Sequence, residues 1–208
     1  MNWVRKRYFI LIVVPYLVGL VGFFIPQTRT LFMQLTPLML AYSFFLVVAE
    51  EWTWLKKRWY HIVIVFTVGI LAEIIGVNTG YLFGDYAYGS AVGPKLLGVP
   101  ILIGTNWVML SVAAFSISAQ IFNHRFLIAL LTGALITAFD MLLEPVAIKY
   151  GWWTWNSVDV PAFNYVCWLI LGILFGFLLY NKSIKTNRSF YMLIIQALFF
   201  MVFLNLEL

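Results

Sequence analysis

Residues 59–89 read WYHIVIVFTVGILAEIIGVNTGYLFGDYAYG, and this stretch joins an apolar segment to two carboxyl groups. Its first part, residues 59–78, has the roughly 20 mainly apolar residues that a helix needs to cross the hydrocarbon core of a membrane. Glu73 lies inside that part, and Asp85 follows in a loop rich in glycine and tyrosine. An ionisable side chain within a membrane helix is costly and points to a function. The stretch therefore predicts a membrane helix whose end carries functional acids.

The composition of the whole chain agrees with a membrane environment. Of its 208 residues, 63% are hydrophobic and only 10% are charged, whereas a soluble domain has roughly 45–50% apolar and about 25% charged residues. The formal net charge of +5 arises from cations between the apolar segments, so membrane topology explains it and no nucleic-acid partner is predicted. The single cysteine, Cys167, excludes an intramolecular disulfide and a metal site built from several cysteines.

Seven apolar segments are long enough to be membrane helices. An open sheet is excluded because lipid cannot satisfy the hydrogen bonds of its edges, and a closed barrel would show short alternating segments. The first segment follows Arg5, Lys6 and Arg7 but continues to Ile25 without a signal-peptide cleavage site, so we interpret it as a helix. We predict an all-α integral membrane protein with one transmembrane domain over residues 1–208. The expected helices cover about residues 8–25, 31–50, 59–78, 97–120, 125–148, 164–181 and 189–206.

The positively charged residues are unevenly divided between the two sides of this arrangement. Ten of the 13 Lys and Arg residues lie on the side of the N-terminus, and cytoplasmic loops carry the excess of these residues. We therefore predict a multi-pass protein of the cell inner membrane, with its N-terminus in the cytoplasm and its C-terminus outside. The ten are Arg5, Lys6, Arg7, Lys56, Lys57, Arg58, Arg125, Lys182, Lys185 and Arg188, and the other three are Arg29, Lys95 and Lys149.

The same orientation gathers most of the acidic residues at one level of the membrane. Five of the eight belong to the outer halves of helices or to the outer loops, namely Glu73, Asp85, Asp140, Glu144 and Asp159. We expect Asp159 to be solvated or to cap a helix. Glu50 and Glu51 lie at the cytoplasmic end of the second segment, near Lys56–Arg58, and we expect them at the interface.

Asp140 and Glu144 are spaced to lie on one face of a helix, one turn apart. Pro145 follows directly and is expected to bend the helix. Two carboxylates so close repel each other, so at least one should hold its proton. If Glu73 lies nearby, the group can supply both a general acid and a general base. The alternative is that these acids cap or cross-link helices, and that Asp85 is a turn residue.

Aromatic side chains surround the expected position of the acids. They fit either anchoring at the membrane interface or a cavity whose π faces stabilise a transient cation. They are Tyr81, Phe83, Tyr86 and Tyr88 in one outer loop and Trp152, Trp153 and Trp155 in the other.

We predict neither a metal nor a cofactor. His61 and His124 lie toward the cytoplasmic side, and no H-E-x-x-H pattern occurs. The D-D-x-x-D pattern of prenyl-transfer enzymes is also missing. A retinal Schiff base is excluded because residues 189–206 contain no lysine.

An internal similarity links the two parts of the chain that carry the acids. Glu73 is followed by GDYAYG and then VPILIGTNW, whereas Asp140 and Glu144 are followed by YGWWTW and then VPAFNYVCW. An acid, an aromatic loop, Val-Pro, Asn and Trp therefore recur in the same order. Such a parallel repeat would place two halves on either side of one site.

At AEIIGVNTGYLFGDYAYG, VPILIGTNW, FDMLLEPVAIKYGWWTW and VPAFNYVCW, the chain resembles the membrane carotenoid hydratase family, of the carotenoid 1,2-hydratase and bacterioruberin-pathway types. The resemblance covers roughly residues 60–175. It implies addition of water to a terminal double bond of γ-carotene, lycopene or a bacterioruberin precursor, without a cofactor. The substrate would enter from the lipid, with its polyene between helices.

The resemblance also implies roles for individual residues. Asp140 or Glu144 would donate the proton, and Glu73 or Asp85 would position the water. Asn106 and Asn164 would orient carboxyls or water. The residues expected to bind substrate are Asn78, Tyr81, Tyr88, Asn106, Trp107, Trp152, Trp155, Asn164 and Trp168.

Two other functions use intramembrane acids. A carotenoid end-group cyclase shares the protonation step but then loses a proton, and a proton-coupled transporter would need acids throughout the membrane. The partners expected for a hydratase are a carotenoid, water, membrane lipid and other enzymes of carotenoid biosynthesis.

Overall fold

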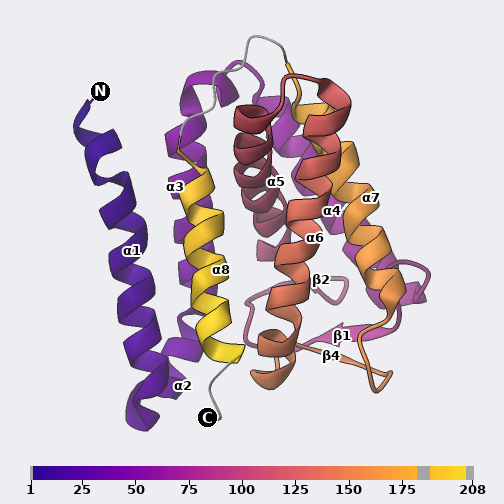
Figure 1. The fold of residues 1–208 in the computed structure, drawn as a ribbon. Helices are drawn as coiled ribbons and strands as arrows, with labels where there is room; N and C mark the ends of the chain where they lie inside the picture. Colours follow the sequence, from indigo (N-terminus) through magenta and orange to yellow (C-terminus); the bar gives the residue numbers. More distant parts are fainter. Residues whose placement is uncertain (1, 182–187, 205–208) are drawn as a thin grey trace.

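The computed structural model describes residues 2–181 and 188–204, with side chains from Arg7 onward within these ranges. The described residues form eight helices and four short strands (Figure 1). The helices are α1 (Asn2–Phe24), α2 (Pro26–Gln34), α3 (Thr36–Leu55), α4 (Trp59–Thr79), α5 (Leu102–Ile121), α6 (Arg125–Lys149), α7 (Ala162–Leu179) and α8 (Phe190–Leu204), and the strands are β1 (Tyr86–Tyr88), β2 (Lys95–Leu96), β3 (Val99–Pro100) and β4 (Trp153–Trp155).

The long helices run up and down a bundle, and the strands gather with the short α2 at one end, called the strand end below (Figure 1). Six helices of the described residues, α1 and α3 to α7, are long and apolar enough to cross a membrane. The described part of α8 is also apolar but has 15 residues. The prediction of an all-helical, multi-pass membrane protein is confirmed to this extent, while the count of seven spans and the orientation stay predictions.

Two of the expected segments are not single continuous helices. Residues 31–50 are divided between α2 and α3, because a proline stands in the first turn of each helix, where it is best tolerated. Residues 97–120 begin with strand β3, and α5 starts only at Leu102. Of the residues used above, Lys182, Lys185, the side chains of Arg5 and Lys6, and the end of segment 189–206 lie outside the described part.

Helices α6 and α7 pack closely because glycines face each other between them. A Cβ added at Gly172 would lie 2.7 Å from the Cα of Gly133. A Cβ at Gly133 would lie 2.8 Å from the carbonyl oxygen of Leu169. Small residues allow such close backbone approach between membrane helices. The contact fixes the position of α6, which continues through Pro145, against α7.

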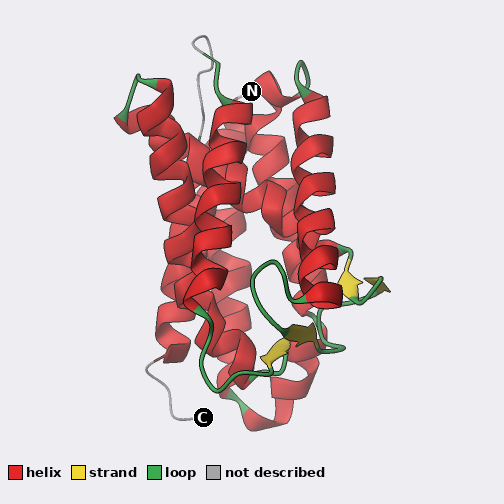
Figure 2. Ribbon diagram, turned by 90° about the vertical axis from the view of Figure 1, so that its right-hand side faces the viewer, coloured by secondary structure: helices red, strands yellow, loops and turns green. Residues whose placement is uncertain are grey.

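The two loops that were expected on one side of the membrane pair with each other at the strand end (Figure 2). Strand β1 is antiparallel to β4, with Tyr86 opposite Trp155 and Tyr88 opposite Trp153. Strands β2 and β3 form a separate small hairpin. The two repeated parts of the sequence are therefore joined directly through their aromatic loops.

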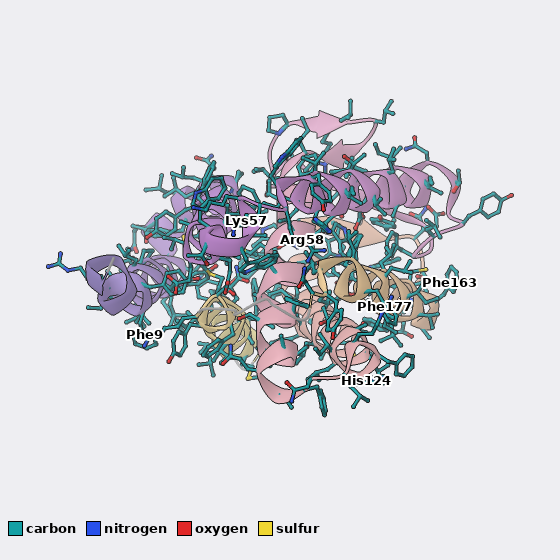
Figure 3. All side chains as sticks on the ribbon, turned by 90° about the horizontal axis from the view of Figure 1, so that it is seen from above. Phe9, Lys57, Arg58, His124, Phe163 and Phe177 are labelled. Carbon is teal, nitrogen blue, oxygen red and sulfur yellow. The ribbon has the colours of Figure 1, made fainter. Side chains whose placement is uncertain are left out.

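At the opposite end, the turn between α3 and α4 is attached to the end of α7. Arg58 donates hydrogen bonds to the carbonyl oxygens of Leu179 at 2.9 Å and Leu178 at 3.3 Å, and it contacts His61 at 2.7 Å. The last carbonyl groups of a helix have no backbone N–H partner within that helix. Arg58 supplies donors to them and so caps the C-terminal end of α7. Figure 3 views the bundle from this end, along the helices. It shows Phe9 of α1 and Phe163 of α7 on the outside of the bundle, and about half of each side chain is exposed.

Candidate active site

Three buried carboxyl groups meet near the strand end of the bundle. Glu73 comes from the last two turns of α4, and Asp140 and Glu144 lie one turn apart on α6. None is more than 3% exposed. The structure thus brings together the acids that the sequence placed on separate helices. They line a cavity of about 30 Å³, called the acid pocket, together with Phe83, Tyr86, Tyr88, Ile103, Asn106, Leu143, Trp153, Trp155, Asn164 and Trp168.

Glu73 accepts hydrogen bonds from three aromatic side chains. The hydroxyls of Tyr86 and Tyr88 both donate to Oε2, the latter at 2.8 Å, and Trp107 Nε1 donates to Oε1 at 3.0 Å. Both oxygens of this carboxyl therefore have partners.

Glu144 is held in a similar way by the other loop. Trp153 Nε1 and Trp155 Nε1 donate to its Oε2 at 2.8 and 3.0 Å. The amide nitrogen of Asn164 lies 3.5 Å from its Oε1.

Asp140 has far fewer partners than the two glutamates. Its Oδ2 accepts one hydrogen bond, from Asn164 Nδ2 at 2.8 Å. Its Oδ1 is buried and has no hydrogen-bond partner among the described residues. Since a buried polar atom is rarely left unpaired, this oxygen is a candidate for contact with a reactant.

The aromatic donors reach the acids because of the alternation of a β-strand. Side chains two residues apart point to the same face, so Tyr86 and Tyr88 of β1 and Trp153 and Trp155 of β4 face the acids, while Ala87 between the tyrosines is exposed. Tyr86 and Trp153 were missing from the predicted binding residues. The patterns Tyr-x-Tyr and Trp-x-Trp were the signal that could have identified them.

Tyr86 and Tyr88 lie outside the membrane-length helices. Burial raises the pKa of both hydroxyls well above the ordinary tyrosine value, and the charge of Glu73 acts in the same direction. Both side chains therefore remain protonated donors to Glu73.

Two stacked tryptophans lie beside the acids. The ring centroids of Trp107 and Trp168 are 4.0 Å apart, with an interplanar angle of 20°. Each is the last residue of one of the repeated Val-Pro motifs, eight residues after its valine. The internal similarity therefore corresponds to a physical contact in the structure.

Five of the predicted site residues do not line the acid pocket, namely Asn78, Tyr81, Asp85, Trp107 and Trp152, although Trp107 donates a hydrogen bond to Glu73. Tyr81 is 80% exposed, and the exposed Asn78 donates to the carbonyl oxygen of Leu97 at 3.0 Å. Asp85 is also exposed and accepts a hydrogen bond from Asn156 Nδ2 at 2.7 Å. This last contact links the two aromatic loops, whereas the structural alternative expected for Asp85 was a turn residue.

A much larger apolar groove of about 490 Å³ adjoins the acid pocket. It is lined by residues of α1, the α2–α3 region, α5, α6 and α8. Trp152, predicted to bind substrate, lines this groove and not the acid pocket. Four residues line both cavities, namely Ile103, Asn106, Leu143 and Trp153.

Comparison with known proteins decides the family. A model of the family described as "Carotenoid biosynthesis protein" matches residues 29–207. This chain belongs to that carotenoid biosynthesis family. The bisanhydrobacterioruberin hydratase of Haloarcula japonica is 32% identical over 108 residues, which are 48% of this chain and 37% of the relative. The chain thus matches little more than a third of that relative's length. The resemblance predicted from the sequence is confirmed, and no solved structure matches.

This member of the carotenoid biosynthesis family also has buried acids at the end opposite the strands. Glu50 and Glu51, which we expected at the membrane interface, have side chains that are only 6% and 0% exposed. Glu51 accepts hydrogen bonds from Trp54 at 2.7 Å, Ser189 at 2.6 Å and Ser116 at 3.5 Å. These contacts connect α3, α5 and the start of α8, so Glu51 links helices. Among the described residues, no group of three or more His, Cys, Asp or Glu side chains could hold a metal ion.

Proposed function

We propose that this chain is a carotenoid hydratase that adds water to the terminal double bond of an acyclic carotenoid end group, as in lycopene or γ-carotene. Its family and its similarity to a bisanhydrobacterioruberin hydratase support the class of substrate and reaction. The observation that carries the proposal is the acid pocket. It holds three buried carboxyls, one with an unpaired oxygen, directly beside an apolar groove.

Asp140 is the proposed proton donor. Hydrogen bonds donated to a carboxyl stabilise its ionised form, and Glu73 accepts three such bonds whereas Asp140 accepts one. Asp140 is therefore the acid best suited to hold a proton. The π electrons of the alkene take this proton onto the less substituted carbon, leaving a tertiary cation and an Asp140 carboxylate. A positioned acid typically contributes about 10²–10⁴-fold in rate.

The aromatic side chains would stabilise the cation. The stacked pair of Trp107 and Trp168, and the rings of Tyr86 and Trp155, whose centroids are 5.0 Å apart, present π faces beside the carboxyls. Such faces attract a cation electrostatically. Because their polar groups already bind Glu73 or Glu144, Tyr86, Trp107 and Trp155 do not compete with water for the cation.

Water then forms a bond from its oxygen to the tertiary carbon. In our proposal, Glu73 positions the water and Glu144 accepts the proton that the water releases. Glu144 passes this proton to Asp140, one turn away and joined to it through Asn164. One water is added, and all three carboxyls return to their starting states.

We further propose that the protein lies in the cell inner membrane with its N-terminus in the cytoplasm, because Lys and Arg are in excess on that side. Membrane lipid would then deliver the substrate. Other enzymes of carotenoid biosynthesis are proposed partners, since substrate and product are both lipid-soluble.

Expression in a host that accumulates lycopene or γ-carotene tests the function. Mass spectrometry of the pigments should show a product heavier by one water. A product of unchanged mass but altered end group would instead identify a cyclase. Unchanged pigment in a strain with confirmed membrane expression would contradict hydratase activity on these substrates.

A further inference from the structure

The acid pocket and the apolar groove differ in size as much as in chemistry. The acid pocket, of about 30 Å³, has room for about two or three water molecules. The long hydrocarbon chain of a carotenoid does not fit in that space. The groove, of about 490 Å³, falls in the range of about 300–1,000 Å³ that is usual for ligand pockets.

The two cavities share one wall. Ile103 and Asn106 come from the first turns of α5, Leu143 from α6 and Trp153 from β4, and all four line both cavities. A molecule in the groove therefore lies against the same side chains as a molecule in the acid pocket. The groove is otherwise walled mainly by apolar side chains, such as Phe139 and Phe199.

We propose that the two cavities separate the two substrates of the reaction. The hydrocarbon chain of the carotenoid lies in the groove with its terminal double bond at the shared wall, where the reacting carbons face Asp140 and the aromatic rings of the acid pocket. The interior of the acid pocket receives only water. This inference rests on the proposed hydratase function and adds to it the place where each reactant binds. The occupant of the groove is the substrate and not an ordinary lipid chain, because the wall of the groove is shared with the cavity that holds the carboxyls.

Asn106 is the polar residue of the shared wall. It is 8% exposed, and its side chain has no hydrogen bond with any described residue. In its counterpart in the second half, Asn164, the side-chain nitrogen contacts both Asp140 and Glu144. An amide that lines both cavities can hold a water molecule toward a cation formed at the shared wall. Asn106 is therefore assigned to orient the attacking water together with Glu73.

Gly19 of α1 offers a way to fill the groove without disturbing the acids. It lines the groove, and a Cβ added there would meet Phe199 at 3.7 Å, an ordinary contact. The neighbouring Val18 is 55% exposed and supplies a matched control on the same helix.

The first experiment compares Gly19→Trp and Val18→Trp in membranes, with lycopene and with a short acyclic terpene that has the same end group. Gly19→Trp should lower hydration of lycopene by about tenfold or more, because the indole excludes several methylenes from apolar burial. Hydration of the short terpene should be unchanged, which also shows that the variant is folded. Val18→Trp should match the unmodified protein on both. Equal hydration of lycopene by Gly19→Trp would mean that the groove holds ordinary lipid, and would overturn the assignment.

The second experiment follows Asn106→Leu in deuterated water. Asp140 should still protonate the alkene, but the resulting cation should lose a proton instead of binding water. Hydration should fall by about tenfold or more, as expected for loss of a buried hydrogen-bonding partner, while recovered lycopene gains deuterium at its end group. Loss of hydration without deuterium uptake would contradict the role of Asn106.

Failure of the function and failure of this inference give different results. If the unmodified protein retains lycopene but never hydrates it, and Gly19→Trp loses the pigment, the hydratase proposal fails while the groove assignment stands. If the unmodified protein hydrates lycopene and Gly19→Trp does so equally, only the groove assignment fails.

Discussion

The acid pocket is built by two repeated halves of the chain, the first from Glu73 to Trp107 and the second from Asp140 to Trp168. Both halves contribute acids, aromatic side chains and an asparagine, but they contribute different numbers of acids. The first half has one acid, whose two oxygens accept three hydrogen bonds. The second has two acids, and Asp140 keeps an unpaired oxygen. The asparagines of the two halves also differ. Asn164 contacts both acids of its own half, whereas Asn106 forms no hydrogen bond with any of the three acids. The two halves thus share an architecture, while the proposed proton donor belongs to the second half alone.

The largest effect is expected for Asp140→Asn. The amide keeps the size of the side chain and its contact with Asn164 but cannot donate a proton of sufficient acidity. Conversion should fall by about 10²–10⁴-fold, measured as product per amount of protein in the membrane. Bound pigment should be retained. Conversion within a few-fold of the unmodified protein would show that the reactive acid is not Asp140.

Glu144→Gln should have the next largest effect. It leaves Trp153 and Trp155 in place but removes the group that accepts the proton of water, so we expect conversion to fall by about a hundredfold. Glu73→Gln, the matched change in the first half, should cost only about tenfold, because it weakens charge-assisted hydrogen bonds without removing the proton acceptor. Equal losses of conversion in the two variants would contradict the different roles proposed for the acids of the two halves. The measurement is initial rate in membranes at matched protein levels.

A smaller effect is expected at the aromatic donors. Trp153→Phe removes one N–H that binds Glu144, and a hydrogen bond to a charged group contributes enough to predict about a tenfold loss of rate. Trp152→Phe is the control, because the indole nitrogen of Trp152 has no partner among the described residues. The same substitution at adjacent positions should thus have different consequences. A larger loss for Trp152→Phe would show that contact with the groove matters more than the hydrogen bond to Glu144.

The smallest effect is expected for Asp85→Asn. Asp85 is exposed and contacts Asn156, and surface changes away from special features usually alter stability little. Rate and thermal stability should both stay within about twofold and a few degrees of the unmodified protein. A loss as large as that of Glu73→Gln would return Asp85 to the catalytic residues.

Part of this arrangement could be predicted from the sequence because it depends on local spacing. The linear order of residues shows the apolar segments, the spacing of one helical turn between Asp140 and Glu144, and the repeated motifs. The repeat also indicated that the two aromatic loops belong to one site. Family resemblance supplied the chemistry in which such acids are used.

Other features depend on which elements become neighbours, and helix spacing does not specify this. The pairing of β1 with β4 decides that Trp153 faces Glu144 while Trp152 faces the groove. Glu51 was expected at the membrane interface because cations follow it in the sequence, but its contacts with Ser116 of α5 and Ser189 before α8 are not visible in that order. Burial of an acid alone therefore does not mark a reactive group.

Isotope-labelled water tests the central claim most directly. Membranes containing the protein and lycopene are incubated in water labelled with heavy oxygen or with deuterium. We predict one labelled oxygen on the tertiary carbon and one solvent-derived hydrogen on the adjacent carbon, both lost in Asp140→Asn. A hydroxylated product without labelled oxygen, or one whose formation does not depend on Asp140, would contradict acid-catalysed hydration in the acid pocket.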